Sequence, residues 1–214
     1  MVLPFLVLLV AGPLVLYQRQ TNADLSMGLV LLVGEFAIIL PVVWFALRRH
    51  ASLADLGFRP FSAKALLAGC GGLLFTYMLV LSFLVFVVAV CLALDIPLPD
   101  TSPAALLAQL PDPWLTFLVA VVAAPLTEEL FFRGFFFAGL RQRLGWVWAA
   151  AISGVIFGLF HLDPLQFVPL TVVGILLAAV YHYTNSIWLP IILHASLNLF
   201  GLSIAFWLVN SGLL

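Results

Sequence analysis

Charge is the scarcest property of this sequence. Only 8% of its 214 residues are Asp, Glu, Lys or Arg, whereas 65% are hydrophobic. Soluble domains contain roughly a quarter charged residues, so this composition excludes an ordinary water-soluble fold. The eight Lys and Arg and the nine Asp and Glu give a net charge of −1 and form no basic patch, which argues against nucleic acid as a partner.

Cysteine is also rare. The two cysteines, Cys70 and Cys91, both lie within apolar runs. We therefore expect them to act as small packing residues and not to form a disulfide.

Long apolar runs dominate what remains, and they predict an all-α, polytopic transmembrane helical bundle. One integral membrane domain, 1–214, is expected to contain about seven spans. An eighth would require a break at Gly69–Gly72 or a split in the last helix. The first stretch lacks a positively charged start and contains Pro4 and Pro13, so we interpret it as a span and not a signal peptide. The predicted helices lie near 3–17, 25–47, 63–94, 113–140, 145–161, 166–183 and 187–210.

The distribution of basic residues between the loops predicts the orientation in the membrane. If seven helices alternate, six Lys and Arg fall in loops on one side and only Arg19 on the other, which instead carries aspartates. Positive loops face the cytoplasm, so we expect a cytoplasmic N-terminus and an external C-terminus. The six residues are Arg48, Arg49, Arg59, Lys64, Arg141 and Arg143.

A few polar residues interrupt the predicted spans. Such groups are costly at membrane depth and usually face the bundle interior, where they find partners. His182 and Asn185 fall in a predicted turn and are expected at the interface. The residues expected inside are Glu35, Glu128, Glu129, Arg133, His161, His194 and Asn198.

The stretch PLTEELFFRG contains three of these charges. Glu129 and Arg133 stand at i and i+4 in the favourable acid-first order, so we expect an ion pair on one helix face. Glu128 points about 100° away and has no basic residue one turn later. Pro125 removes a helix hydrogen bond just before the pair, which predicts a kink beside Glu128.

Two further helices carry polar motifs. His161 ends the segment FGLFH, and His194 and Asn198 share one face at i and i+4. A single buried histidine is more often a hydrogen-bonding partner than a catalyst, but three separate motifs together favour a site. Glu35 has no local partner, and two roles stay open for it: a protonated hydrogen-bonding acid, or the partner of a base on another helix.

The three motifs, in this order, resemble the CPBP family of CAAX proteases and bacteriocin-processing enzymes, also called the Abi family. The resemblance covers about 113–200, and the inner loop adds a family-like LADLGFRP. The family's best-known members have eight spans. The motifs are Glu128-Glu129-x-x-x-Arg133, Phe157-x-x-x-His161 and His194-x-x-x-Asn198.

The resemblance implies an intramembrane glutamic endopeptidase that acts on a peptide or membrane protein. From the compactness of the sequence we expect the inner membrane of a bacterium. In that family, residues at the positions of Glu128 and His161 are thought to activate a water. The positions of His194 and Asn198 are thought to polarise the scissile carbonyl and hold the oxyanion. Glu129 and Arg133 occupy supporting positions, and no cofactor is expected.

Three alternatives remain open. Glu128, His161 and His194 are a His₂Glu set of the kind found in catalytic zinc sites, although no HExxH is present. Intramembrane Glu, His and Arg also mark the proton paths of transporters. A non-catalytic scaffold or bacteriocin-immunity role is the third alternative.

Overall fold

The structure, a computed structural model, describes residues 27–97 and 113–211. Within these ranges the chain is all-α and forms six continuous helical rods. They are α2 (Met27–Arg49), α3 (Ala63–Ala93), the rod that begins at Pro113, α8 (Trp146–Phe160), α9 (Pro164–Thr184) and α10 (Trp188–Asn210). Six of the seven predicted helices are thus confirmed, and the predicted span at 3–17 lies outside the described residues.

The rod that begins at Pro113 changes its helix type along its length. It consists of α5 (Pro113–Leu118), η1 (Val119–Ala123), α6 (Ala124–Glu129), η2 (Leu130–Phe137) and α7 (Ala138–Leu144), where η1 and η2 are π-helical. The two glutamates of the motif therefore end a short α-helical segment between two π-helical ones. η1 ends two residues before Pro125. Proline has no backbone N–H to donate, and here it stands where the helix changes from the π to the α hydrogen-bond pattern.

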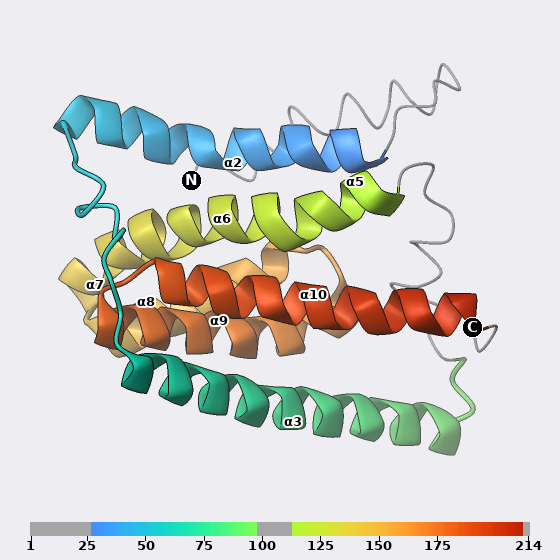
Figure 1. The fold of residues 1–214 in the computed structure, drawn as a ribbon. Coiled ribbons are helices and arrows are strands. Elements are labelled where there is room, and N and C mark those ends of the chain that lie inside the picture. The colour runs from blue at the N-terminus through green and yellow to red at the C-terminus, as the bar shows by residue number, and fades with distance from the viewer. Residues whose placement is uncertain (1–26, 98–112, 212–214) are drawn as a thin grey trace.

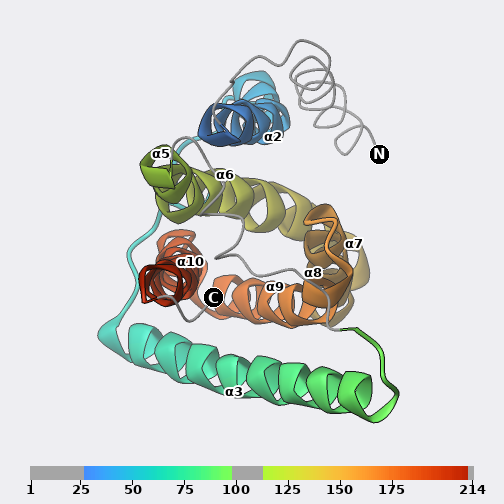
Figure 2. The same cartoon turned by 90° about the vertical axis from the view of Figure 1, so that its right-hand side faces the viewer.

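The rods lie roughly side by side, with α2 and α3 on opposite outer sides and the motif-bearing helices between them (Figures 1 and 2). α3 runs without a break through Gly69–Gly72, so the break that would add an eighth span does not occur there. Cys70 and Cys91, both on α3, are free thiols, as predicted. Two described helices, α3 and α9, are long and apolar enough to cross a membrane, and Trp146–Phe160 and Trp188–Ile204 are shorter apolar helices.

The closest helix contact joins α8 to α9. A methyl group at Gly154 would lie 2.8 Å from the carbonyl oxygen of Thr171, and one at Gly158 would lie 2.7 Å from that of Phe167. Real side chains do not approach backbone so closely, so only glycine permits this separation. The spacing Gly154-x-x-x-Gly158 is the small-residue pattern of packed membrane helices.

Local capping explains where the helices begin and end. The Ser62 hydroxyl accepts a hydrogen bond from the Ala65 backbone N–H at the start of α3, and Asp163 caps α9 in the same way. Asn185 ends α9 in the left-handed conformation, with φ of 50°.

Asp55 lies in the loop before α3. Its carboxyl accepts hydrogen bonds from the hydroxyl and the backbone N–H of Ser52, and these bonds lower the pKa of that carboxyl.

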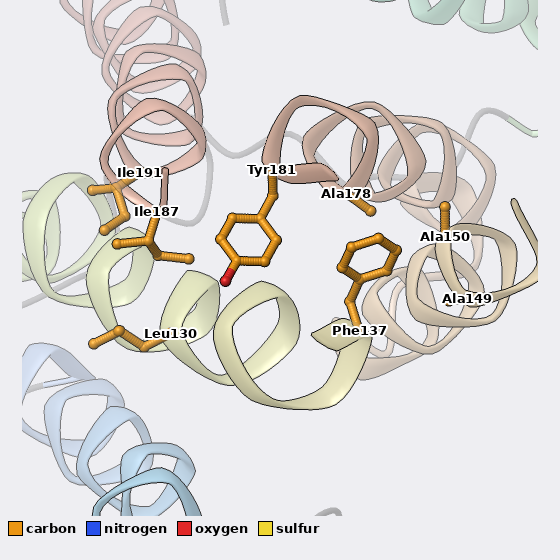
Figure 3. Close-up of a cluster of buried hydrophobic side chains, with 8 residues drawn as sticks. All are labelled: Leu130, Phe137, Ala149, Ala150, Ala178, Tyr181, Ile187 and Ile191. Carbon is orange, nitrogen blue, oxygen red and sulfur yellow. The ribbon is translucent and has the colours of Figure 1, made fainter. Parts of the chain in front are cut away.

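The loop between α2 and α3 packs against the turn between α9 and α10. The backbone N–H of Ile187 donates to the carbonyl of Gly57 over 2.7 Å, and the Ser186 hydroxyl donates to the carbonyl of Arg59 over 2.5 Å. Nearby, Phe137 and Tyr181 face one another, with ring centroids 6.1 Å apart, in a buried apolar cluster (Figure 3). These contacts close one end of the bundle and hold the motif helices in place.

Candidate active site

Glu129 lies at the centre of the buried polar network. Its Oε1 accepts a hydrogen bond from Arg133 Nη1 over 2.6 Å and lies 2.9 Å from His194 Nδ1. Both Glu129 and Arg133 are fully buried. The predicted Glu129–Arg133 ion pair is therefore confirmed, but the hydrogen bond from His194 to the same oxygen was not anticipated from the sequence.

Arg133 extends this network to α9. Its Nη2 donates to the backbone carbonyl of Gly174 over 3.1 Å. The guanidinium also lies 4.7 Å from the ring centroid of Phe157, the residue that opens the Phe157-x-x-x-His161 motif. Because Gly174 sits at the close crossing of α8 and α9, Arg133 ties the motif helix to the tightest contact of the fold.

Glu128 has different surroundings from its neighbour. It is 6% exposed, and within the described residues its buried Oε2 has no hydrogen-bond partner. Its carboxyl interacts electrostatically with His194, Glu35, Glu129 and Arg133. Glu128 is thus buried among charges but its carboxyl, unlike that of Glu129, has no hydrogen bond to a described residue.

Glu35 reaches the same region from α2. The hydroxyl of Thr127 donates a hydrogen bond to Glu35 Oε2, although 92 residues separate the two in sequence. Glu35 is 9% exposed and interacts electrostatically with His161. This contact was missed from the sequence, where Thr127 gave no sign of its role beyond preceding the two glutamates.

His161 stands at the C-terminal end of α8, on an exposed position. Its Nδ1 lies 2.9 Å from the carbonyl oxygen of Phe157. A carbonyl oxygen only accepts hydrogen bonds, so Nδ1 carries a proton and Nε2 is the nitrogen left for other partners. The same argument applies to His194 when Glu129 is ionised, because a carboxylate also only accepts.

Asn198 lies one turn after His194 on α10 and is partly buried. Its Nδ2 donates to the backbone carbonyl of Ala120 over 2.7 Å. Ala120 belongs to η1, where the π-helical pattern redirects backbone carbonyls. The side-chain amide has a second N–H, so this bond leaves Asn198 able to donate to another oxygen.

The structure therefore joins Glu129, Arg133 and His194 in one hydrogen-bonded network, places Glu128 among their charges, and gives His161 and Asn198 backbone partners. Across the described ranges, no hydrogen bond joins His161 or Asn198 to a glutamate. No group of three or more His, Cys, Asp or Glu side chains in these ranges is arranged to hold a metal ion. The His₂Glu set of Glu128, His161 and His194 thus does not fit a zinc site in this conformation.

Comparison with known proteins identifies the part of the chain that carries the three motifs. A family described as "Type II CAAX prenyl endopeptidase Rce1-like" matches residues 110–200, which include all six residues of the predicted site but not Glu35. No solved structure matches the chain.

Two curated proteins are similar to this chain. "Putative membrane peptidase YdiL" of Bacillus subtilis (strain 168) is 35% identical over 86 residues, which are 40% of this chain and 35% of that protein. "UPF0177 protein YxdF" of Lactococcus lactis subsp. lactis (strain IL1403) is 31% identical over 103 residues, 48% of this chain and 56% of that protein. The matches thus span about a third to a half of these relatives. Through residues 110–200, the chain is similar to the Rce1-like type II CAAX prenyl endopeptidase family, and one of its relatives is named a putative membrane peptidase.

Proposed function

We propose that this chain is an intramembrane endopeptidase in which Glu128 activates the attacking water. The observation that carries the proposal is the difference between two adjacent glutamates. Each has a buried Oε2 with no partner, but Glu129 Oε1 is engaged by Arg133 and His194, whereas no hydrogen bond or ion pair among the described residues reaches the Glu128 carboxyl. A buried carboxyl without a structural partner is costly, so its retention in the motif favours a chemical role.

The other residues supply the remaining requirements of amide hydrolysis. Glu128 takes a proton from water as the water oxygen bonds to the scissile carbonyl carbon. The electron pair of the C=O double bond moves to the oxygen, which receives hydrogen bonds from the second N–H of Asn198 and from protonated Nε2 of His194. As the C–N bond breaks, His161 gives a proton from Nε2 to the amine, and the proton held by Glu128 replaces it.

Glu129 and Arg133 support this chemistry without touching the substrate. Glu129 holds Nδ1 of His194, so it fixes the ring orientation and balances the charge when the imidazole is protonated. Arg133 keeps Glu129 ionised and anchors it to the backbone of Gly174. These roles explain why an ion pair is buried beside Glu128.

The setting we propose is a polytopic membrane domain of about seven spans. The six described rods match the predicted spans in order and extent. The C-terminal ends of α2 and α7 and the N-terminal end of α3, which carry the predicted basic residues, lie toward one end of the bundle (Figure 1). We assign this end to the cytoplasm of a bacterial inner membrane, following the positive-inside rule.

The decisive experiment compares the wild type with Glu128→Gln in liposomes. The probe is a panel of internally quenched peptides with CAAX-type ends, each made with and without a farnesyl group. We expect the wild type to cleave at least one peptide and Glu128→Gln to lose at least about a hundredfold in kcat. The thermal unfolding midpoint should stay close to that of the wild type.

Asp55→Asn is the matched control, since it removes one acidic charge from an exposed position outside the three motifs. A wild type that cleaves no peptide of the panel, or a fully active Glu128→Gln, would overturn the proposal. The same assay with a metal chelator distinguishes the zinc-dependent alternative from the metal-free mechanism. We expect activity to survive chelation, and loss of activity restored by added zinc would contradict a metal-free mechanism.

A further inference from the structure

The two motif histidines differ in their acidic partners. Glu128 and Glu129 interact with Arg133 and His194, whereas the charged groups around His161 are Glu35, Arg133 and Asp163. Each imidazole has to hold a positive charge at some stage of the proposed reaction. His194 has the carboxyl of Glu129 as a direct partner at 2.9 Å, whereas no carboxyl group among the described residues is hydrogen-bonded to His161.

Glu35 is the third carboxyl near these groups, and it lies outside residues 110–200. It shares a buried face of α2 with Ile38 and Val42, at intervals of three and seven residues. Ile38 and Val42 pack into the apolar cluster around Phe132 and Phe157. Burying a carboxyl group on that face costs free energy unless the group is paired. The partners of Glu35 therefore indicate its role.

Thr127 fixes the position of Glu35. The Thr127 oxygen lies next to Glu35 Oε2 and 2.9 Å from the carbonyl oxygen of Ala123, and its single proton can serve only one acceptor at a time. When Glu35 is ionised, the carboxylate is the stronger acceptor and takes this proton. Thr127 immediately precedes Glu128, so the bond holds the Glu35 carboxylate beside the motif.

The electrostatic partners of Glu35 lie on both sides of it. Its charge attracts His161 and repels Glu128. His161 Nδ1 is engaged by the carbonyl of Phe157, so the ring's orientation is fixed and a nearby charge can act on it without moving it. Glu35 and Asp163 are the two acidic groups that interact with His161, and of these Glu35 is the one that also interacts with Glu128.

We propose that Glu35 is a positioning residue that serves His161 as Glu129 serves His194. Its carboxylate, held by Thr127, stabilises the imidazolium form of His161 from which the leaving amine receives its proton. The site then contains two Glu–His pairs, Glu129–His194 and Glu35–His161, with Glu128 between them as the unpaired base. This inference rests on the proposed endopeptidase function.

The competing explanation is that Glu35 only braces α2 against α6 through Thr127. Glu35→Gln separates the two roles, because a glutamine can still hydrogen-bond to the Thr127 hydroxyl but carries no charge. If Glu35 is a charge partner of His161, Glu35→Gln should lower kcat about tenfold to a hundredfold. This decrease is smaller than the decrease expected when an acid–base group itself is removed. KM should stay within about twofold, and the unfolding midpoint should not move, because the hydrogen bond persists.

The experiment is a double-mutant cycle with His161→Ala, run on the full chain in liposomes with a peptide that the wild type cleaves. If Glu35 acts through His161, adding Glu35→Gln to His161→Ala should lower kcat by less than about twofold relative to His161→Ala alone. Wild-type kcat in Glu35→Gln, or an undiminished loss in the His161→Ala background, would overturn the inference. Glu128→Gln is measured in parallel. If Glu128→Gln is active, the endopeptidase proposal fails. If Glu128→Gln is inactive while Glu35→Gln keeps wild-type kcat, only the role of Glu35 fails.

Thr127 gives a second test that does not depend on Glu35→Gln folding well. Thr127→Val removes the hydroxyl that holds Glu35 and should lower kcat, whereas Thr127→Ser keeps a hydroxyl and should restore it. Thr76→Val is the matched control, because Thr76 is a buried threonine on α3 outside the site. Equal kcat in Thr127→Val and Thr127→Ser would contradict the inference.

Discussion

The ion pair of Glu129 and Arg133 leads to an unusual expectation about stability. Glu129→Gln removes the only carboxylate that is hydrogen-bonded to Arg133 in the described part of the chain, and the guanidinium stays fully buried. Leaving one member of a buried pair uncompensated costs about 3–5 kcal/mol. Arg133→Met is milder, since Glu129 keeps His194 and the methionine still packs against Phe157. It loses the ion pair with Glu129, whose carboxyl can be neutralised by a proton as a guanidinium cannot, and the bond to Gly174; such interhelical bonds contribute about 0.6–1.7 kcal/mol in membranes.

These magnitudes fix the order of the variants. The double variant Glu129→Gln/Arg133→Met removes both charges, so it should be more stable than Glu129→Gln alone, by about 2 kcal/mol. The i,i+4 pair lies within one helix, and helices persist in detergent-unfolded membrane proteins. The difference therefore reports the burial of Arg133 in the bundle and not the local pair.

Equilibrium unfolding in mixed micelles, with increasing SDS and followed by tryptophan fluorescence, measures this order. We expect the wild type to be most stable, followed by Arg133→Met and the double variant, with Glu129→Gln last. If the double variant is less stable than Glu129→Gln, then Arg133 is not held mainly by Glu129, and the reasoning about the network is refuted.

Two other predictions concern the same region. Asn198→Leu should lower kcat by about 10²–10³ with little change in KM, because it removes a hydrogen-bond donor to the oxyanion. The control is Ser196→Ala, at an exposed position on α10. Equal kcat values in the two variants would exclude Asn198 as an oxyanion donor. Gly158→Ala should lower the unfolding midpoint by forcing α8 away from the Phe167 carbonyl, whereas Gly139→Ala, where a methyl group meets nothing within 4 Å, should not. Equal midpoints for the two alanine variants would show that the α8–α9 separation can relax at no cost.

The helices and one of the contacts were accessible from the sequence because they depend on local patterns. Apolar runs predicted the six described rods to within four residues at each end, and the i,i+4 spacing predicted the Glu129–Arg133 pair. The Gly154-x-x-x-Gly158 spacing was present in the sequence as a sign of close helix packing, but it was not used. The unbroken course of α3 through Gly69–Gly72 shows that its glycines alone do not end an apolar helix.

The tertiary contacts were not accessible in this way. His194 bonds to Glu129 across 65 residues, and Thr127 bonds to Glu35 across 92. Helical periodicity says which residues share a face, but not which face of another helix opposes them. The sequence also gave no indication of η1 and η2, since a change from α- to π-helix alters neither apolarity nor length enough to be noticed.

The π-helical segments have a consequence for the counting of residues. An α turn takes 3.6 residues and a π turn takes more, so each segment sets the rotational phase between the stretches before and after it. Each residue of Val119–Ala123 turns the chain by less than the roughly 100° of an α-helical residue. If the segment became α-helical at unchanged length, Glu128 would rotate relative to Trp114, whereas deleting one residue there would leave it facing nearly the same way. The direction in which Glu128 points is therefore set by the helix type of this segment together with the number of residues in it.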